Sequence, residues 1–177
     1  FPSGGIGRLT GSSDATMGVI ITASHNPAED NGIKLFDARG AKLSRERESV
    51  IESVLDSPNL VAPKGPGVGA RSSISDGLNK YLEMLTSGVS YKFSGISVVL
   101  DTANGSAYQA APELMARLKT DFETMHNTPD GNNINLRCGA TDTASLREAC
   151  VGKIGLAFDG DADRLIAVDE RGREANG

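Results

Sequence analysis

Residues 154–169 read IGLAFDGDADRLIAVD, and this stretch decides the fold class. Two apolar runs of strand length, Ile154–Phe158 and Leu165–Asp169, flank an acidic turn. Continuous apolar runs of this length are typical of strands that are buried on both faces. We therefore predict two buried strands joined by a turn that carries three carboxylates.

The chain upstream alternates short strand-like runs with amphipathic segments. Strands are predicted at Met17–Thr22, Ile33–Phe36, Ala41–Leu43, Ile96–Leu100 and Asp121–Met125. Helices are predicted after Ser44, after Ser75-Asp76, between Gly105 and Leu118, and over Thr143–Ala149. Pro112 should start the third of these helices late or kink it. The alternation of strands and helices indicates the α/β class.

A segment rich in proline and glycine, Ser57–Ser73, divides the chain. Such composition favours a linker over a packed element. We therefore predict two units, one over residues 1–73 and the other over residues 74–177.

Composition and charge exclude several classes of protein. Hydrophobic residues make up 38% of the 177 residues, which is ordinary for a folded globular chain. The formal net charge of −5 argues against a generic nucleic-acid or anionic-membrane binder, since both need a surplus of Lys and Arg. No apolar run approaches the length of about 18 residues that spans a membrane. Cys138 and Cys150 are expected to be buried free thiols in a reducing compartment. The first residue, Phe1, and the stop just after a strand-like segment suggest a fragment.

The acidic turn is the strongest chemical signal. Asp159, Asp161 and Asp163 stand two residues apart, and carboxylates this close favour a bound cation. A solvated acidic turn and an EF-hand-type Ca²⁺ loop are the alternatives, but that loop needs glycine where Arg164 stands. We favour Mg²⁺ together with a phosphate group, to which Arg164 supplies a second contact.

A second polar motif follows the first predicted strand. Ser24 is a candidate nucleophile with His25 as proton carrier, although an ordinary turn serine is the simpler interpretation. Lys34 follows a predicted turn that could return its ammonium group to the serine, where the charge would suit phosphate. On spacing alone, a surface lysine at a strand edge is the alternative.

Together these motifs resemble the α-D-phosphohexomutase superfamily. GVIITASHNP at residues 18–27 is similar to its phosphoserine loop, DNGIKLF at 30–36 to the continuation of that loop, and GLAFDGDADR at 155–164 to its metal loop. LDTANGSAY at 100–108, PDGNNIN at 129–135 and CGAT at 138–141 most resemble the bacterial phosphoglucosamine mutase subfamily.

The resemblance implies two three-layer α/β/α domains with mixed sheets, the first incomplete. Residues 1–73 would be the later part of domain 1, and residues 74–177 most of domain 2. Ser24 would carry phosphate, Mg²⁺ would be held by Ser24, Asp159, Asp161 and Asp163, and the catalytic residues would be Ser24, His25, Lys34 and Arg164. Family enzymes have two further domains, so this chain alone is expected to be inactive.

By resemblance, the reaction converts glucosamine 6-phosphate to glucosamine 1-phosphate through a bisphosphorylated sugar, in the supply of UDP-N-acetylglucosamine for cell-wall synthesis. A cytoplasmic enzyme with a phosphosugar substrate, possibly a homodimer, is implied. A phosphomannomutase or phosphoglucomutase of the same superfamily is the nearest alternative. From other classes, a non-catalytic Ca²⁺ module stays open, as does a dehalogenase-like phosphatase, whose motif wants Thr or Val where Asp163 stands.

Overall fold

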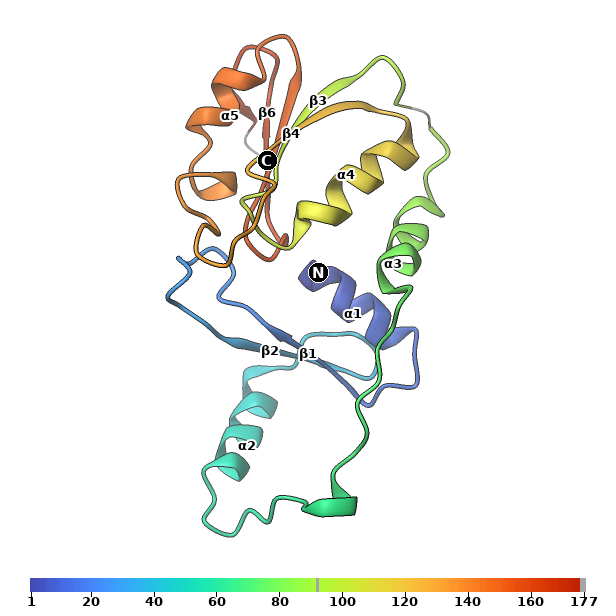
Figure 1. The fold of residues 1–177 in the computed structure, drawn as a ribbon, viewed down its shortest axis with the longest axis vertical. Helices are drawn as coiled ribbons and strands as arrows, with labels where there is room; N and C mark the ends of the chain where they lie inside the picture. Colours follow the sequence, from blue (N-terminus) through green and yellow to red (C-terminus); the bar gives the residue numbers. More distant parts are fainter. Residues whose placement is uncertain (92, 176–177) are drawn as a thin grey trace.

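The computed structural model describes residues 1–91 and 93–175. Its larger unit is built around a five-stranded mixed sheet (Figure 1). The strand order is β4-β3-β5-β6-β7. The parallel part holds β4 (Asp121–Met125), β3 (Ser97–Asp101) and β5 (Ile154–Phe158). The antiparallel part adds β6 (Leu165–Val168) and β7 (Glu174–Ala175). Parallel strands thus end at the same edge of the sheet, where polar loops collect.

Helices cover both faces of this sheet. Val98 and Leu100 of β3 pack with Ala107 and Ala111 of α4 (Ala107–Leu118) on one face. Val99, between them, packs on the other face with Leu146 of α5 (Ala144–Ala149). Successive strand residues point to opposite faces of the sheet, so the side chains on both faces of β3 are buried. The predicted three-layer arrangement is confirmed for this C-terminal unit, residues 97–175.

The N-terminal unit, residues 3–55, is smaller. Strands β1 (Met17–Ile21) and β2 (Ile33–Asp37) form a two-stranded antiparallel sheet, against which α1 (Ser3–Gly11) packs. Helix α2 (Arg45–Leu55) follows. Its apolar side chains are largely exposed, with Val50 and Leu55 62% and 64% accessible.

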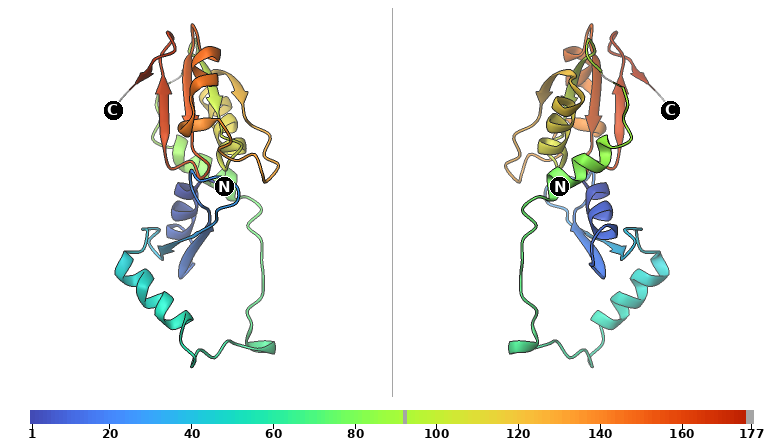
Figure 2. Two further views of the ribbon diagram at one scale, coloured as in Figure 1. Left: turned by 90° about the vertical axis from the view of Figure 1, so that its left-hand side faces the viewer. Right: turned by 90° about the vertical axis from the view of Figure 1, so that its right-hand side faces the viewer.

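A long connection separates the two units. Residues 58–76 are exposed at every position and contain one short 3₁₀ turn, η1 (Gly65–Gly67). Figure 2 shows this segment running apart from the rest of the chain before it enters α3 (Gly77–Thr86). Helix α3 contacts both α1 and α4, so it lies where the units meet.

The structure differs from the sequence expectations at three places. The glycine-rich segment Ser3–Gly11 forms a helix that the sequence did not suggest; its glycines allow close approach to the turn at Arg39–Gly40, so packing outweighs their poor helix propensity. Helix α4 begins at Ala107, before Pro112, so the late start was wrong; small residues of its first turns pack into the sheet core. Ala41–Leu43 forms only an isolated bridge, from Lys42 to Phe36, in place of a strand.

Two further findings concern the cysteines and the helices. Cys138 and Cys150 are fully buried free thiols, as predicted. Among the residues that the structure describes, no helix is both long and apolar enough to cross a lipid bilayer.

Candidate active site

Two loops from different units meet at one point. One follows β1 and carries Ser24, and the other joins β5 to β6 and carries the acidic turn. Oγ of Ser24 lies 3.0 Å from Oδ2 of Asp159 and 3.0 Å from Oδ1 of Asp161. The fold therefore brings together two motifs that lie 135 positions apart in the sequence.

The main chain of Ser24 adopts an uncommon conformation. Its φ of 57° is in the left-handed region, which residues with a Cβ rarely occupy. The N–H of Ser24 donates to Oγ1 of Thr22 at 2.9 Å, and the N–H of Asn26 donates to the carbonyl of Ala23 at 3.1 Å. These bonds fold a tight turn at the end of β1, and that turn aims the hydroxyl at the acidic loop.

The acidic loop is closed by its own first carboxylate. Oδ1 of Asp159 accepts the main-chain N–H groups of Asp163 and Arg164, both at 3.1 Å. Asp159 and Asp161 are 0% and 1% exposed, whereas Asp163 is exposed. Gly105 packs against the loop so closely that a Cβ there would lie 2.5 Å from the carbonyl oxygen of Gly160. A larger residue at position 105 would push the acidic loop away.

Lys34 reaches the acidic loop from β2. Its Nζ lies 2.5 Å from Oδ2 of Asp161 and 3.1 Å from Oδ2 of Asp163. Burial acts to lower the pKa of Lys34, but hydrogen bonds and charge attraction from the two carboxylates outweigh it and raise the pKa. The side chain is therefore an ammonium group in this arrangement.

Asp161 is the carboxylate with the most partners. Burial alone would raise its pKa, but the bonds from Lys34, Ser24 and Ser3 hold the pKa below its usual value. Asp161 is thus ionised, and it is contacted by groups from the N-terminal unit on several sides.

Arg164 lies beside Ser24 and Asp159, whereas the side chain of His25 is exposed. Arg164 Nε donates to Oδ2 of Asp159 at 3.0 Å, and its Nη2 lies 3.5 Å from Oγ of Ser24. His25 is exposed, and within the described part of the chain no hydrogen bond or ion pair joins it to the cluster. Of the catalytic residues predicted from the sequence, the fold gathers Ser24, Lys34 and Arg164.

The donor set fits a hard divalent cation. One carboxylate oxygen from each of Asp159, Asp161 and Asp163 lies within 4.8 Å of the others. Among the described residues, the three carboxylates pair with two cations, Lys34 and Arg164. The single hydroxyl proton of Ser24 cannot hydrogen-bond fully to both carboxylates near it. Oxygen atoms at this density are the ligands that Mg²⁺ and Ca²⁺ prefer.

Two residues that touch the site were missed by sequence reasoning. Ser3 donates its N–H to the carbonyl of Asp161 at 2.9 Å, and its hydroxyl lies 3.3 Å from Oδ2 of Asp161. Asn135 donates from Nδ2 to the carbonyl oxygens of Ser24 and Asn26. Nothing in the sequence marks Ser3, whereas Asn135 ends one of the quoted subfamily motifs.

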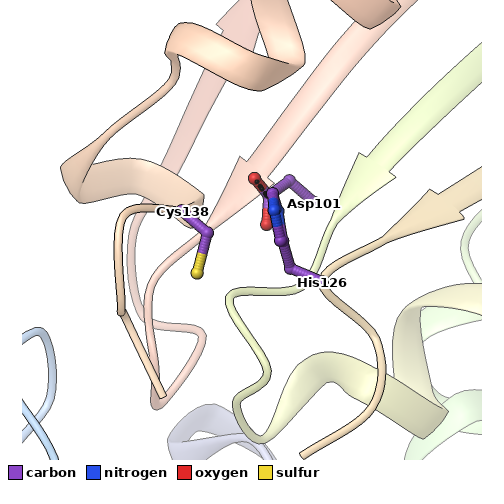
Figure 3. A group of neighbouring side chains, drawn as sticks. All are labelled: Asp101, His126 and Cys138. Atoms are coloured by element: carbon purple, nitrogen blue, oxygen red, sulfur yellow. Dashed lines mark hydrogen bonds and ion pairs between the residues drawn. The ribbon is translucent and has the colours of Figure 1, made fainter. Parts of the chain in front are cut away.

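A second group of possible metal ligands lies near the ends of β3 and β4 (Figure 3). It consists of Asp101, His126 and Cys138. Asp101 Oδ2 accepts from His126 Nδ1 and from the N–H of Gly139, both at 2.9 Å, and Oδ1 accepts the N–H of Ala103 at 2.9 Å. Burial, reinforced by nearby carboxylates, raises the pKa of the Cys138 thiol to about 11. The Asp101 carboxylate thus joins the end of β3 to His126, after β4, and to Gly139 through hydrogen bonds.

Comparison with known proteins supports the sequence motifs. The model of the phosphoglucomutase/phosphomannomutase family, alpha/beta/alpha domain I, matches residues 5–60, and that of domain II matches residues 79–172. The chain is 48% identical to the phosphoglucosamine mutase of Syntrophobacter fumaroxidans, with 100% of this chain and 41% of that protein covered. It is 47% identical to the phosphoglucosamine mutase of Lactobacillus delbrueckii subsp. bulgaricus, with 98% and 40% covered.

A solved structure supports the fold. A putative phosphomannomutase from Thermus thermophilus superimposes with a TM-score of 0.80 at 21% identity, covering 99% of this chain and 41% of that one. The chain thus spans about two fifths of the length of the curated relatives it matches.

Proposed function

The chain belongs to the phosphoglucomutase/phosphomannomutase family, and from this premise we propose that it supplies the phosphoserine and metal loops of a phosphoglucosamine mutase. One observation carries the proposal: Oγ of Ser24 stands 3.0 Å from carboxylates of both Asp159 and Asp161. A hydroxyl beside two carboxylates is placed to exchange its proton for a phosphoryl group that shares a cation with them. The phosphoglucosamine mutases at 47–48% identity favour this branch of the family.

Mg²⁺ is the proposed metal. Asp159, Asp161 and Asp163 would hold it together with an oxygen of phosphorylated Ser24. Three carboxylates leave ligand positions open, and Mg²⁺ usually combines a few carboxylates with phosphate and water. When bound, the ion offsets the negative charge of the transferring phosphoryl group.

The remaining residues stabilise charge and move a proton. During transfer, the bond between Ser24 Oγ and phosphorus breaks and a bond from the sugar hydroxyl to phosphorus forms, so the hydroxyl proton must leave. Lys34 is an ammonium group here, which suits it to neutralise phosphate oxygens and donate a proton to Oγ. Lys34 after that donation, or the exposed His25, is proposed to accept the sugar proton. Arg164 would contact the phosphoryl oxygens.

The proposed substrate is glucosamine 6-phosphate, which becomes glucosamine 1-phosphate through the 1,6-bisphosphate. The enzyme is proposed to act in the cytoplasm, in the supply of UDP-N-acetylglucosamine, with a homodimer as the proposed assembly. Binding energy from distant parts of a substrate fixes the reacting geometry. Since the relatives are more than twice as long, residues 1–177 alone are expected to give no sustained mutase turnover. A single, slow phosphoryl transfer to Ser24 from a bisphosphate in large excess is still expected, because Ser24, Lys34 and the acidic loop are all present.

Phosphorylation of Ser24 tests the proposal directly. The 177-residue chain is incubated with Mg²⁺ and glucosamine 1,6-bisphosphate, and intact-mass and peptide mass spectrometry locate any phosphate. We expect one phosphoryl group on Ser24, none on the Ser24→Ala variant, and an unchanged result for Ser72→Ala, a matched substitution in the exposed linker.

The other outcomes separate the alternatives. Phosphate on Asp159 would indicate a phosphatase-type aspartyl nucleophile. An unphosphorylated chain that binds Ca²⁺ tightly and ignores Mg²⁺ would indicate a calcium module. Asp161→Asn should lower Mg²⁺ affinity at least about tenfold in calorimetry, because it removes one unit of charge from the site; wild-type affinity would contradict the magnesium assignment.

A further inference from the structure

The motif PDGNNIN, residues 129–135, has no part in the function proposed above, yet its last residue reaches the candidate nucleophile. Asn135 lies in the loop between β4 and the 3₁₀ turn η2 (Gly139–Thr141). Its Nδ2 donates to the carbonyl oxygen of Ser24 at 2.9 Å and to that of Asn26 at 3.0 Å. Both partners are carbonyls and can only accept, so the amide nitrogen must face them. One side chain of the C-terminal unit thus holds the main chain on either side of His25.

Asn135 is itself anchored on the C-terminal unit. Its φ is 56°, and its N–H donates to the carbonyl oxygen of Ala103 at 2.9 Å. Ala103 is tied by its own N–H to the buried carboxylate of Asp101. A chain of hydrogen bonds therefore runs from Asp101, at the end of β3, through Ala103 and Asn135 to the Ser24 loop. Because its base is fully buried, this chain forms a stiff support.

The acidic loop lies against the same support. A Cβ at Gly160 would lie 2.7 Å from Nδ2 of Asn135 and would also meet the carbonyl oxygen of Ser24. The N–H of Ser106 donates to the carbonyl of Gly160 at 2.7 Å. The Ser24 loop, the acidic loop and the loop that carries Asn135 are therefore in close contact. The distance from Ser24 to the carboxylates depends on how these three loops pack.

The amide keeps this position at an energetic cost. Its Oδ1 is buried and has no hydrogen-bond partner among the described residues. Leaving a buried polar atom without a hydrogen-bond partner is destabilising. Ser24 is also held in the left-handed region, which is strained for a residue other than glycine. Such costs collect at sites where geometry matters for function.

We propose that Asn135 is a positioning residue, which holds the Ser24 main chain so that Oγ faces Asp159 and Asp161 and thereby sets the rate of phosphoryl transfer at Ser24. It does not touch the reacting atoms. The inference rests on the phosphoserine function proposed above. The proposed role also explains what two sequence motifs do: residues 100–108 and 129–135 together supply the hydrogen bonds that support the Ser24 loop.

The rate at which Ser24 takes phosphate from glucosamine 1,6-bisphosphate tests this inference. In the 177-residue chain with Mg²⁺, Asn135→Ala should slow phosphorylation about 10- to 100-fold, since small displacements of a reacting group cost about this much. Asn135→Asp keeps the size but sets a carboxylate against two carbonyl oxygens, so it should be at least as slow. Asn132→Ala, an exposed asparagine in the same loop, is the matched control and should react at the wild-type rate.

Mg²⁺ affinity and thermal stability distinguish positioning from a general structural role. A positioning role slows phosphorylation while the Mg²⁺ dissociation constant changes by less than about threefold, because the carboxylates stay in place. A structural role would weaken stability, Mg²⁺ binding and rate together, and that result would overturn the proposal. If Asn135→Ala does not fold, the isosteric Asn135→Asp decides the question by the same measurements.

The two proposals fail separately. A wild-type chain that takes no phosphate at Ser24 defeats the proposed function, and this inference with it. A wild-type chain that is phosphorylated at Ser24, with Asn135→Ala and Asn135→Asp reacting equally fast, defeats the role of Asn135 alone.

Discussion

The two units of this chain are held together in different ways. The C-terminal unit buries residues such as Leu100, Leu146 and Val168 on both faces of a five-stranded sheet. In the N-terminal unit, Phe36 is the one large apolar side chain that is buried among the described residues. Its sheet has two strands, and Ile21 and Ile33 are 71% and 67% exposed. The carboxylates of the acidic loop thus belong to a unit with a well-packed apolar core, whereas Ser24 belongs to a unit with little buried apolar surface.

This difference shows how the position of Ser24 is determined. Polar contacts across the boundary join the site: Ser3 and Lys34 reach Asp161 from one side, and Asn135 reaches the Ser24 loop from the other. Polar contacts are directional, whereas apolar packing is not. The N-terminal unit therefore supplies the candidate nucleophile Ser24, and contacts from the C-terminal unit hold the loop that carries it.

The largest effect expected is on stability, and it would test the contrast in packing directly. Leu100→Ala removes a fully buried side chain from the sheet core, so it should lower the free energy of unfolding by about 2–5 kcal/mol. Ile21→Thr, on the exposed face of β1, should change it by less than about 0.5 kcal/mol. Chemical denaturation of both variants gives the comparison. Equal losses would mean that the exposed face of β1 is covered in solution.

A smaller effect is expected from the ion pair that joins the units. Lys34→Ala leaves the buried carboxylate of Asp161 without its ammonium partner, so we expect a loss of about 1–3 kcal/mol in the presence of EDTA. Added Mg²⁺ should recover part of this loss, because the ion replaces the missing positive charge. Thermal unfolding with and without Mg²⁺ measures both.

The control for Lys34 is Lys64→Ala, which removes an exposed lysine of the connection and should leave stability unchanged. A Lys34→Ala chain as stable as the parent in EDTA would show that Lys34 does not link the units.

The smallest effect concerns pH, and it should be confined to the C-terminal unit. The hydrogen bonds from Arg173 and from the main chain lower the pKa of Asp169 from 3.8 to about 2. Since the folded-state pKa is depressed, its stabilising contribution is complete above the unfolded value of 3.8 and disappears as pH falls through about 2. Asp169→Asn should therefore lower the melting temperature slightly at pH 5–7, and the difference from the parent should vanish near pH 2.

Mg²⁺ affinity of Asp169→Asn at neutral pH should equal that of the parent, because Asp169 lies in the β6–β7 turn and not in the acidic loop. Glu170→Gln, at the exposed neighbouring position, is the control for the charge change. A pH-independent difference in melting temperature would contradict the role of the Asp169 carboxylate.

Much of the site could be predicted from local sequence. Three aspartates on alternate positions of a tight turn lie close together, so a candidate cation site at Asp159–Asp163 could be predicted once the turn between the two strands was recognised. The strands around that turn were equally clear, since continuous apolar runs of this length favour buried strands. The family resemblance added Ser24 and Lys34 to the same site, where the spacing of residues alone left a turn serine and a surface lysine as alternatives.

Contacts over long separations in the chain were decided by the tertiary structure alone. Helix α1 forms because its glycines fit against a turn some thirty residues away, which outweighs their low helix propensity. Ser3 meets Asp161 across 158 positions and Asn135 meets Ser24 across 111, and no local pattern encodes either pair. Local sequence was enough to identify the residues with the chemistry for a metal and a phosphate, because that chemistry belongs to side chains and short spacings. Only the packing of the two units decided that the residues face one another, because hydrogen bonds act over about 3 Å and depend on where the whole chain places their partners.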